Sequence, residues 1–544
     1  MRRHLVAAAL VAPLLLAACQ QKPSIPTPGP GASAPASPSS AVAVPSGSAT
    51  VTTTSKDVAG FQLSAHRRQE QYTSPDRTSV ASDATPPGFA APPPGQGRQR
   101  YLDQTIRWSA CDGFECGTVL VPLDWDRPDG QAITLKMKRR VADQKRTGTL
   151  FINPGGPGAS GQQMLETFDW NSFPQRDVVG WDPRGTGEST PVVCGTPEQT
   201  EAYLASESSP DDAQEFQAAV AQNKHFAAQC RQGSGALLDH ISTIDTARDL
   251  DYLRFLVGDD TLDYLGISYG TYIGAMYAEL YPQRTGRMVL DSAVNITTDD
   301  SVIQAMGFDL ALRNYATWCA EQKCELGSTA DEVIASVTGI FDSLDQEPLE
   351  VEDRELTQGL GVTGAVTYLY TGSSGYTQLT QALVSARNGN GEPLLATADI
   401  MNGRQSDGSY DSMTYGFPGV GCVDAEDPGI DGSVKEFEQD KKKAPVLAPY
   451  FGVSLTCPVW SAKPSPQLEL RARGAAPILV LGATGDPATP YEQAVSMAEQ
   501  LEPGVLLTWK GAGHSAWDLG NACVKSAVRD FVNDGTVPPD KKVC

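Results

Sequence analysis

Short apolar runs alternate with amphipathic stretches along the chain beyond residue 100. Such runs predict β-strands at residues 118–123, 133–141, 149–153, 177–182, 262–267, 287–291, 477–483 and 505–509. Several of them, such as 478–481, are apolar without interruption, which is typical of strands buried on both faces. Residues 242–257 between them place apolar side chains at helical spacing, and residues 211–230 are rich in helix formers. This alternation predicts an α/β fold with a mostly parallel central sheet and helices on both faces.

The alternation is interrupted between residues 295 and 458. Helical patterns such as 330–344 and 376–387 dominate there, and strand signals are few. We therefore expect a core in two parts, residues 101–294 and 459–544, with a helical cap at 295–458 inserted over the sheet.

The first hundred residues follow a different pattern. Two arginines precede an apolar run at 5–18, which is shorter than a membrane-spanning helix and indicates an export signal at 1–19. The end of the signal, Leu16-Ala17-Ala18-Cys19, resembles the lipobox of bacterial lipoproteins, which would make Cys19 the lipidated residue of an anchored protein. An ordinary secretory signal cut near the same place is the alternative. Residues 20–100, rich in Pro, Ser and Ala, predict a disordered tether.

Charge and cysteine content narrow the function classes. The 544 residues carry a net charge of −23, which argues against nucleic-acid binding. Without Cys19, ten of the 11 cysteines remain, an even number that fits five disulfides outside the cytoplasm. Sequence leaves many pairings open; the sequential set, with its short loops, is preferred: Cys111–Cys116, Cys194–Cys230, Cys319–Cys324, Cys422–Cys457 and Cys523–Cys544. We expect no metal site, because these cysteines form no C-x-x-C pair and no histidine lies near them.

The first chemical signal is Ser268, in the G-x-S-x-G pattern Gly266-Ile267-Ser268-Tyr269-Gly270. A strand signal precedes it and a helix signal at 272–281 follows, which is the arrangement of a nucleophile elbow. Glycines suit a tight turn that pushes the serine hydroxyl outward. The alternative is a glycine-rich turn that only packs a helix on a strand.

A serine nucleophile needs a histidine base and an acid that orients it. Of the five histidines, only His514 follows a strand late in the chain, where its loop can reach the carboxyl edge of a parallel sheet. Asp486, after the strand at 477–483, is the favoured acid and gives the order Ser, Asp, His. Asp291, at the end of another strand, is the competitor.

Acyl transfer also needs N–H donors for an oxyanion. The residue after the nucleophile, Tyr269, is one expected donor. The second is Gly156, in the loop Asn153-Pro154-Gly155-Gly156-Pro157-Gly158 that follows an apolar strand. A merely flexible turn is the alternative for this loop.

Together, Ser268, Asp486, His514, the glycine loop and the turn Gly180-Trp181-Asp182-Pro183-Arg184-Gly185-Thr186-Gly187 resemble the proline iminopeptidase family of α/β-hydrolase serine peptidases, nearest its exported tripeptidyl aminopeptidase branch. The resemblance spans roughly residues 105–544. It implies an α/β-hydrolase fold, a cap that restricts access and carboxylates that bind the substrate's ammonium group. Asp424 is the chosen candidate among Asp424, Glu426 and Asp427; a solvated acidic loop is the alternative. This chain has Asn-Pro before Gly-Gly where the classical enzymes have His, which argues against a strict prolyl preference.

We expect an exported serine exopeptidase that releases di- or tripeptides from peptide N-termini, acts as a monomer and needs no cofactor. A carboxylesterase or lipase would use the same triad. A binding protein on an inactive hydrolase fold is the non-enzyme alternative.

Overall fold

The computed structural model describes residues 59–60, 63, 75–77, 88–425 and 427–544. The expected export signal at 1–19, its Cys19 and most of the tether lie outside this part of the chain. Among the described residues, no helix is long and apolar enough to cross a membrane.

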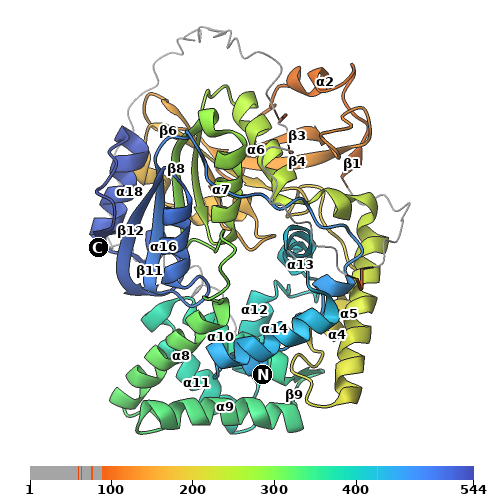
Figure 1. Cartoon of the computed structure of the whole chain (residues 1–544), viewed down its shortest axis with the longest axis vertical. Helices are drawn as coiled ribbons and strands as arrows, with labels where there is room; N and C mark the ends of the chain where they lie inside the picture. The colour runs from red at the N-terminus through yellow and green to blue at the C-terminus, as the bar shows by residue number, and fades with distance from the viewer. Residues whose placement is uncertain (1–58, 61–62, 64–74, 78–87, 426) are drawn as a thin grey trace, which may run out of the picture.

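The core is one large sheet of 11 strands with the order β13-β12-β11-β8-β7-β5-β6-β4-β3-β2, and β1 pairs with β4 (Figure 1). Neighbouring strands are parallel along the part of this order from β13 to β6. The remaining pairs, among β6, β4, β3, β2 and β1, are antiparallel. The strands are β1 (Phe89–Ala90), β2 (Ser109–Cys111), β3 (Phe114–Pro122), β4 (Ala132–Arg140), β5 (Gly148–Asn153), β6 (Arg176–Asp182), β7 (Leu262–Ile267), β8 (Thr285–Asp291), β11 (Ile478–Gly485), β12 (Gly504–Ala512) and β13 (Lys542–Val543).

The central strands are buried on both faces, as their apolar runs predict. Every residue of β5, β6 and β7 is buried. Alternate side chains enter different hydrophobic cores: Phe151 faces the core that includes α6 and α7, while Leu150 and Ile152 face the core that includes α3 and α18. Helices thus cover both faces, and the α/β-hydrolase fold is confirmed. The core helices are α2 (Gln99–Leu102), α3 (Gly161–Thr167), α4 (Pro197–Leu204), α5 (Ala213–Ser234), α6 (Thr243–Leu256), α7 (Tyr269–Leu280), α16 (Tyr491–Gln500), α17 (Ala516–Leu519) and α18 (Ala522–Asp534).

Helices dominate between β8 and β11 and lie beyond one edge of the sheet, in the lower half of Figure 1. Several of them share a hydrophobic core of their own, built from residues such as Leu312, Phe341 and Leu383, whereas Val420 and Val423 of α13 pack in the main core. A short hairpin of β9 (Leu349–Val351) and β10 (Arg354–Leu356) accompanies them. The helices are α8 (Gln304–Glu321), α9 (Ala330–Gln346), α10 (Gln358–Leu369), α11 (Tyr376–Arg387), α12 (Glu392–Met401), α13 (Ser412–Asp424), α14 (Gly429–Lys443) and α15 (Ala448–Phe451).

Within the described part of the chain, five disulfides join the ten cysteines in sequential pairs, as the preferred pairing predicts. Such bonds persist in oxidising compartments, so they indicate a protein that works outside the cytoplasm. Two of them close loops of more than thirty residues, Cys194–Cys230 and Cys422–Cys457.

The end of the segment assigned to the tether belongs to the folded body. Strand β1 lies within residues 20–100 and adds to the sheet beside β4, and helix α2 begins in the same segment, at Gln99. Earlier in the chain, Ala59 is fully buried and its N–H donates to Asp251 at 3.0 Å. The low apolar content of this segment hides these contacts, because they are made mainly by backbone groups and single side chains.

Candidate functional site

Ser268 occupies the sharp turn between β7 and α7. Its backbone has φ 57° and ψ −126°, a conformation that non-glycine residues seldom adopt. The flanking glycines make the turn possible: a Cβ on Gly266 would lie 2.5 Å from the carbonyl oxygen of Gly270, and one on Gly270 would lie 2.9 Å from that of Asn153. The close backbone packing expected of a nucleophile elbow is therefore present.

His514 lies in the loop between β12 and α17, and its ring is paired with Asp486. Nδ1 of His514 is 2.8 Å from Oδ1 of Asp486 and 3.1 Å from Oδ2. Burial alone would lower the pKa of His514, but the charge of Asp486 and this hydrogen bond outweigh it and raise the pKa above the ordinary 6.5.

Asp486 follows the bulge at the end of β11 and is itself firmly held. Its carboxylate accepts hydrogen bonds from the N–H groups of Ala488 and Thr489 at 3.0 and 2.9 Å. The hydroxyls of Ser292 and Thr489 donate to its other oxygen at 2.7 and 3.0 Å. Together these four donors hold the carboxylate so that Oδ1 faces Nδ1 of His514, and the carboxylate in turn fixes the orientation of the ring.

Asp291, the competing acid, has other partners. Its buried carboxylate accepts hydrogen bonds from the Ser515 hydroxyl and from the N–H groups of Ala516 and Trp517. Burial raises the pKa of Asp291 to about 6. The structure thus pairs His514 with Asp486 and uses Asp291 to hold the residues that follow His514.

Tyr370, at the end of cap helix α10, contacts the base as well, and the sequence analysis missed it. The carbonyl of Tyr370 accepts a hydrogen bond from the backbone N–H of His514 at 2.8 Å, and the two rings meet edge to face with centroids 5.3 Å apart. Nothing in the sequence pattern marks Tyr370, because the contact depends on how the cap packs on the core.

The glycine loop after β5 lies directly against the turn at Ser268. A Cβ on Gly155 would lie 2.5 Å from the carbonyl oxygen of Ile267 and 2.9 Å from the nitrogen of Tyr269. Gly155 and Gly156 have φ 93° and 104°, which favour glycine at both positions. Among the described residues, neither the N–H of Gly156 nor that of Tyr269 has a hydrogen-bond acceptor. Both backbone donors therefore belong to segments in mutual contact beside Ser268.

Asp424 ends cap helix α13 and meets the start of α6. It accepts hydrogen bonds from the backbone N–H and the hydroxyl of Thr243 and from the hydroxyl of Ser465. The Thr243 hydroxyl also contacts the phenol of Tyr269, so only one side chain separates Asp424 from the residue next to Ser268. Burial raises the pKa of Asp424 to about 6.

The other two acidic candidates have different positions. Asp427 is buried and accepts a hydrogen bond from Arg77 at 2.7 Å within an ion pair. Glu426 lies outside the described residues. Of the three candidates, the structure brings Asp424 into the hydrogen-bond network that reaches Tyr269.

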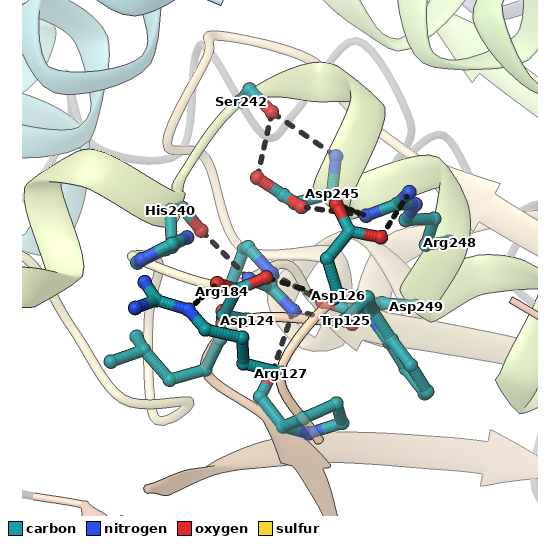
Figure 2. A network of polar contacts seen from close by, with 12 residues as sticks. Asp124, Trp125, Asp126, Arg127, Arg184, His240, Ser242, Asp245, Arg248 and Asp249 are labelled. Carbon is teal, nitrogen blue, oxygen red and sulfur yellow. Dashed lines mark hydrogen bonds and ion pairs between the residues drawn. The ribbon is translucent and has the colours of Figure 1, made fainter. Parts of the chain in front are cut away.

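The turn at 180–187 has a structural role. Figure 2 shows the polar contacts of one of its residues, Arg184. Arg184 forms a fully buried ion pair with Asp249, with two contacts of 2.7 Å. It also donates to the carbonyl oxygens of Leu123 and His240. His240 thus borders this network through its backbone, and burial lowers the pKa of its ring.

A histidine and an acidic cluster outside this site have structural partners. His225 is on α5, where its ring forms a hydrogen bond with the side chain of Gln229 one turn later. The acidic residues Asp211, Asp212 and Glu215 have carboxylate oxygens within 4.8 Å of one another, close enough to share a cation. Asp212 and Glu215, however, form the capping box of α5, which accounts for their proximity.

Comparison with known proteins gives the family. Residues 444–544 match a family model described as TAP-like protein, and residues 148–331 match the model of the alpha/beta hydrolase fold. The serine protease Hip1 of Mycobacterium tuberculosis is 33% identical over 480 residues, which span 81% of this chain and 91% of the relative. The chain belongs to the TAP-like family of α/β-hydrolases.

Other TAP-like relatives carry different activities in their names. Carboxylesterase B of M. tuberculosis is 34% identical over 80% of this chain and 89% of its own length. A tripeptidyl aminopeptidase of Streptomyces lividans is 28% identical over 82% of this chain and 86% of its own length. This TAP-like chain is accordingly a serine hydrolase, and its relatives include both peptidases and an esterase.

Proposed function

We propose that the protein is an exported serine exopeptidase that releases di- or tripeptides from peptides with a free N-terminus. The observation that carries the proposal is the bond between His514 and Asp486, in a fold that presents Ser268 on a strained turn at the same edge of the sheet. The residues, their chain order and the sheet edge are those of an acyl-transfer triad.

In this mechanism His514 takes the hydroxyl proton of Ser268 while the serine oxygen attacks the scissile carbonyl carbon. The tetrahedral intermediate collapses, the C–N bond breaks, and protonated His514 gives its proton to the leaving amine. Water then attacks the acyl-enzyme, its proton passes through His514, and Ser268 regains its hydrogen. Asp486 keeps the imidazole in the required tautomer and stabilises its charged form.

The N–H groups of Gly156 and Tyr269 stabilise the oxyanion in this proposal. Loss of one such donor typically lowers turnover by about 10²- to 10³-fold. Support comes from the direct packing of the glycine loop on the turn at Ser268.

Asp424 binds the ammonium group of the substrate. Its carboxylate is half-buried, and its network through Thr243 reaches the residue next to Ser268. An ammonium group that leaves water needs such a partner, since an unpaired buried charge is costly. A blocked N-terminus or an internal peptide bond does not supply this charge.

Carboxylesterase activity is the second candidate, favoured by the relative that bears that name. The test compares hydrolysis of a tripeptide anilide with hydrolysis of its N-acetyl derivative and of a short-chain aryl ester. The exopeptidase proposal predicts that acetylation raises KM or abolishes turnover. Equal rates with and without the acetyl group, together with faster ester cleavage, would instead establish an esterase.

Export and anchoring complete the proposal. The five disulfides support a site of action outside the cytoplasm. Lipidation at Cys19 would attach the enzyme to the membrane surface, and mass spectrometry of the mature N-terminus tests it.

A further inference from the structure

We propose that Asp291 and Ser292, two consecutive residues at the end of β8, are positioning residues that hold all three members of the triad in register. The inference rests on the proposed roles of Ser268, Asp486 and His514. It assigns to Asp291, the competing acid, a different contribution to the same site.

The first link runs to the nucleophile. The carbonyl oxygen of Asp291 accepts a hydrogen bond from the backbone N–H of Ser268 at 2.9 Å. Strands β7 and β8 are parallel neighbours, and their pairing ends with Ile267 opposite Asp291. The bond from Ser268 therefore extends the ladder one residue into the strained turn and fixes where that turn leaves the sheet.

The second link runs to the loop of the base. The Asp291 carboxylate accepts three hydrogen bonds, at 2.9, 3.0 and 2.9 Å, from the Ser515 hydroxyl and the N–H groups of Ala516 and Trp517. The hydroxyl of Ser292 accepts a fourth, from the N–H of Ser515 at 2.8 Å. The chain immediately after His514 is thus bound to both residues.

The third link runs to the acid. The Ser292 hydroxyl has one hydrogen, which it donates to Oδ2 of Asp486 at 2.7 Å. The hydroxyl oxygen of Ser292 accepts a hydrogen bond from Ser515 N–H, so the direction of both bonds is determined. Ser292 has φ 53°, and its N–H donates to the carbonyl oxygen of Leu481 on β11 at 3.1 Å. One hydroxyl thereby connects Asp486 with the residue next to His514.

These contacts exceed what stability of α17 requires. The helix already has its own cap, because the Ser515 hydroxyl accepts a hydrogen bond from the N–H of Asp518. Asp291 comes from a distant strand and is fully buried, and no arginine or lysine among the described residues pairs with it. Burial of an unpaired carboxylate costs free energy, and here its three hydrogen bonds all go to the loop that carries the base.

The experiment measures kcat and KM on a tripeptide anilide, and the rate of labelling by a fluorophosphonate, for Asp291→Asn and Ser292→Ala. Misplacement of catalytic groups by about 1 Å can cost roughly a hundredfold in rate. We expect kcat and the labelling rate to fall about tenfold to a hundredfold in each variant. KM should change little, because neither residue belongs to the proposed ammonium site.

Asp263→Asn is the matched control. Asp263 is a buried carboxylate on β7 that also accepts a backbone N–H, from Arg287 at 2.7 Å. It precedes Ser268 by five positions, which is about 16 Å along an extended strand. We expect this variant to lose thermal stability because Arg176 loses its partner, while kcat stays at the level of the unmodified enzyme.

The outcomes distinguish a wrong catalytic assignment from a wrong positioning assignment. If Ser268→Ala still labels with the fluorophosphonate, the proposed catalytic role is wrong. If Ser268→Ala abolishes labelling but Ser292→Ala and a folded Asp291→Asn keep the unmodified kcat and labelling rate, the positioning role is wrong. Thermal unfolding identifies variants that do not fold; should Asp291→Asn be one of them, Ser292→Ala decides, since it removes only a hydroxyl.

Discussion

Two groups of buried or half-buried aspartates in this molecule are held by different kinds of partner. Away from the proposed site, Asp249 and Asp251 on α6 and Asp263 on β7 each pair with at least one arginine at 2.5 to 2.9 Å. At the site, Asp291, Asp486 and Asp424 are bound by N–H groups and hydroxyls, and by the imidazole in the case of Asp486. No arginine or lysine pairs with these three among the described residues.

The difference has a physical reason. An arginine beside a buried carboxylate neutralises it permanently and fixes geometry, as Arg184 does for Asp249 in Figure 2. Neutral donors hold a carboxylate just as firmly but leave its charge available. That charge can then stabilise a cation that comes and goes, such as an imidazolium or a substrate ammonium.

The largest expected effect is that of Ser268→Ala. Without the nucleophile, turnover should fall by about 10⁶-fold, as it does in subtilisin. Thermal stability should be unchanged or nearly so, because the Ser268 side chain makes no hydrogen bond to any residue that the structure describes. The measurement is kcat on a peptide anilide with the unmodified enzyme as reference, and retention of more than a few per cent of activity would contradict the assignment.

Asp486→Asn and Asp249→Asn test the comparison with one variant at the site and one away from it. The first should lower kcat by about 10⁴-fold with little loss of stability, because the amide oxygen can still accept N–H groups but the base loses its charge partner. The second should leave kcat nearly intact yet reduce the free energy of unfolding by about 3 to 5 kcal/mol, because Arg184 remains buried beside a neutral group. Denaturant unfolding and steady-state kinetics on the same preparations check both, and an exchange of the two phenotypes would refute the comparison.

Asp424→Asn sharpens the comparison at the substrate end. We expect KM for substrates with a free amine to rise about tenfold to a hundredfold, which corresponds to about 1.4 to 2.8 kcal/mol of lost binding. Substrates that lack the amine should show the same KM in both enzymes. An equal change for both substrate classes would point to a structural role at the start of α6.

The smallest expected effect appears in the pH profile. His514 must be neutral to accept the serine proton, and its pKa is raised, so kcat/KM should decline on acidification from a point above pH 6.5, about tenfold per pH unit at the low end. Below about pH 6 the protonation of Asp424 should also raise KM for substrates with a free amine. Activity that is flat from pH 8 to pH 5 would exclude an ionising base of this kind.

Much of the core could be predicted because the longer strands contain short apolar runs, some of them uninterrupted, such as 478–481 in β11. All eight predicted strands are present. The core strands β1, β2 and β13 were not predicted, because two or three residues are too few to show the alternation of a strand. The pairing of His514 with Asp486 was also accessible, because chain order and strand ends locate both residues.

The supporting contacts of the site were not accessible to sequence reasoning. Ser292 contributes one hydroxyl and a positive φ, and Tyr370 contributes a backbone carbonyl; neither leaves a pattern along the chain. Both act through tertiary packing, Ser292 between strands β8 and β11 and Tyr370 between the cap and the β12 loop.

The bond between the Tyr370 carbonyl and the backbone of His514 limits how this enzyme can open. A hinge motion that lifted α10 away from the sheet would pull on the very loop that carries the base. We therefore expect α10 to stay docked on this loop when substrate binds.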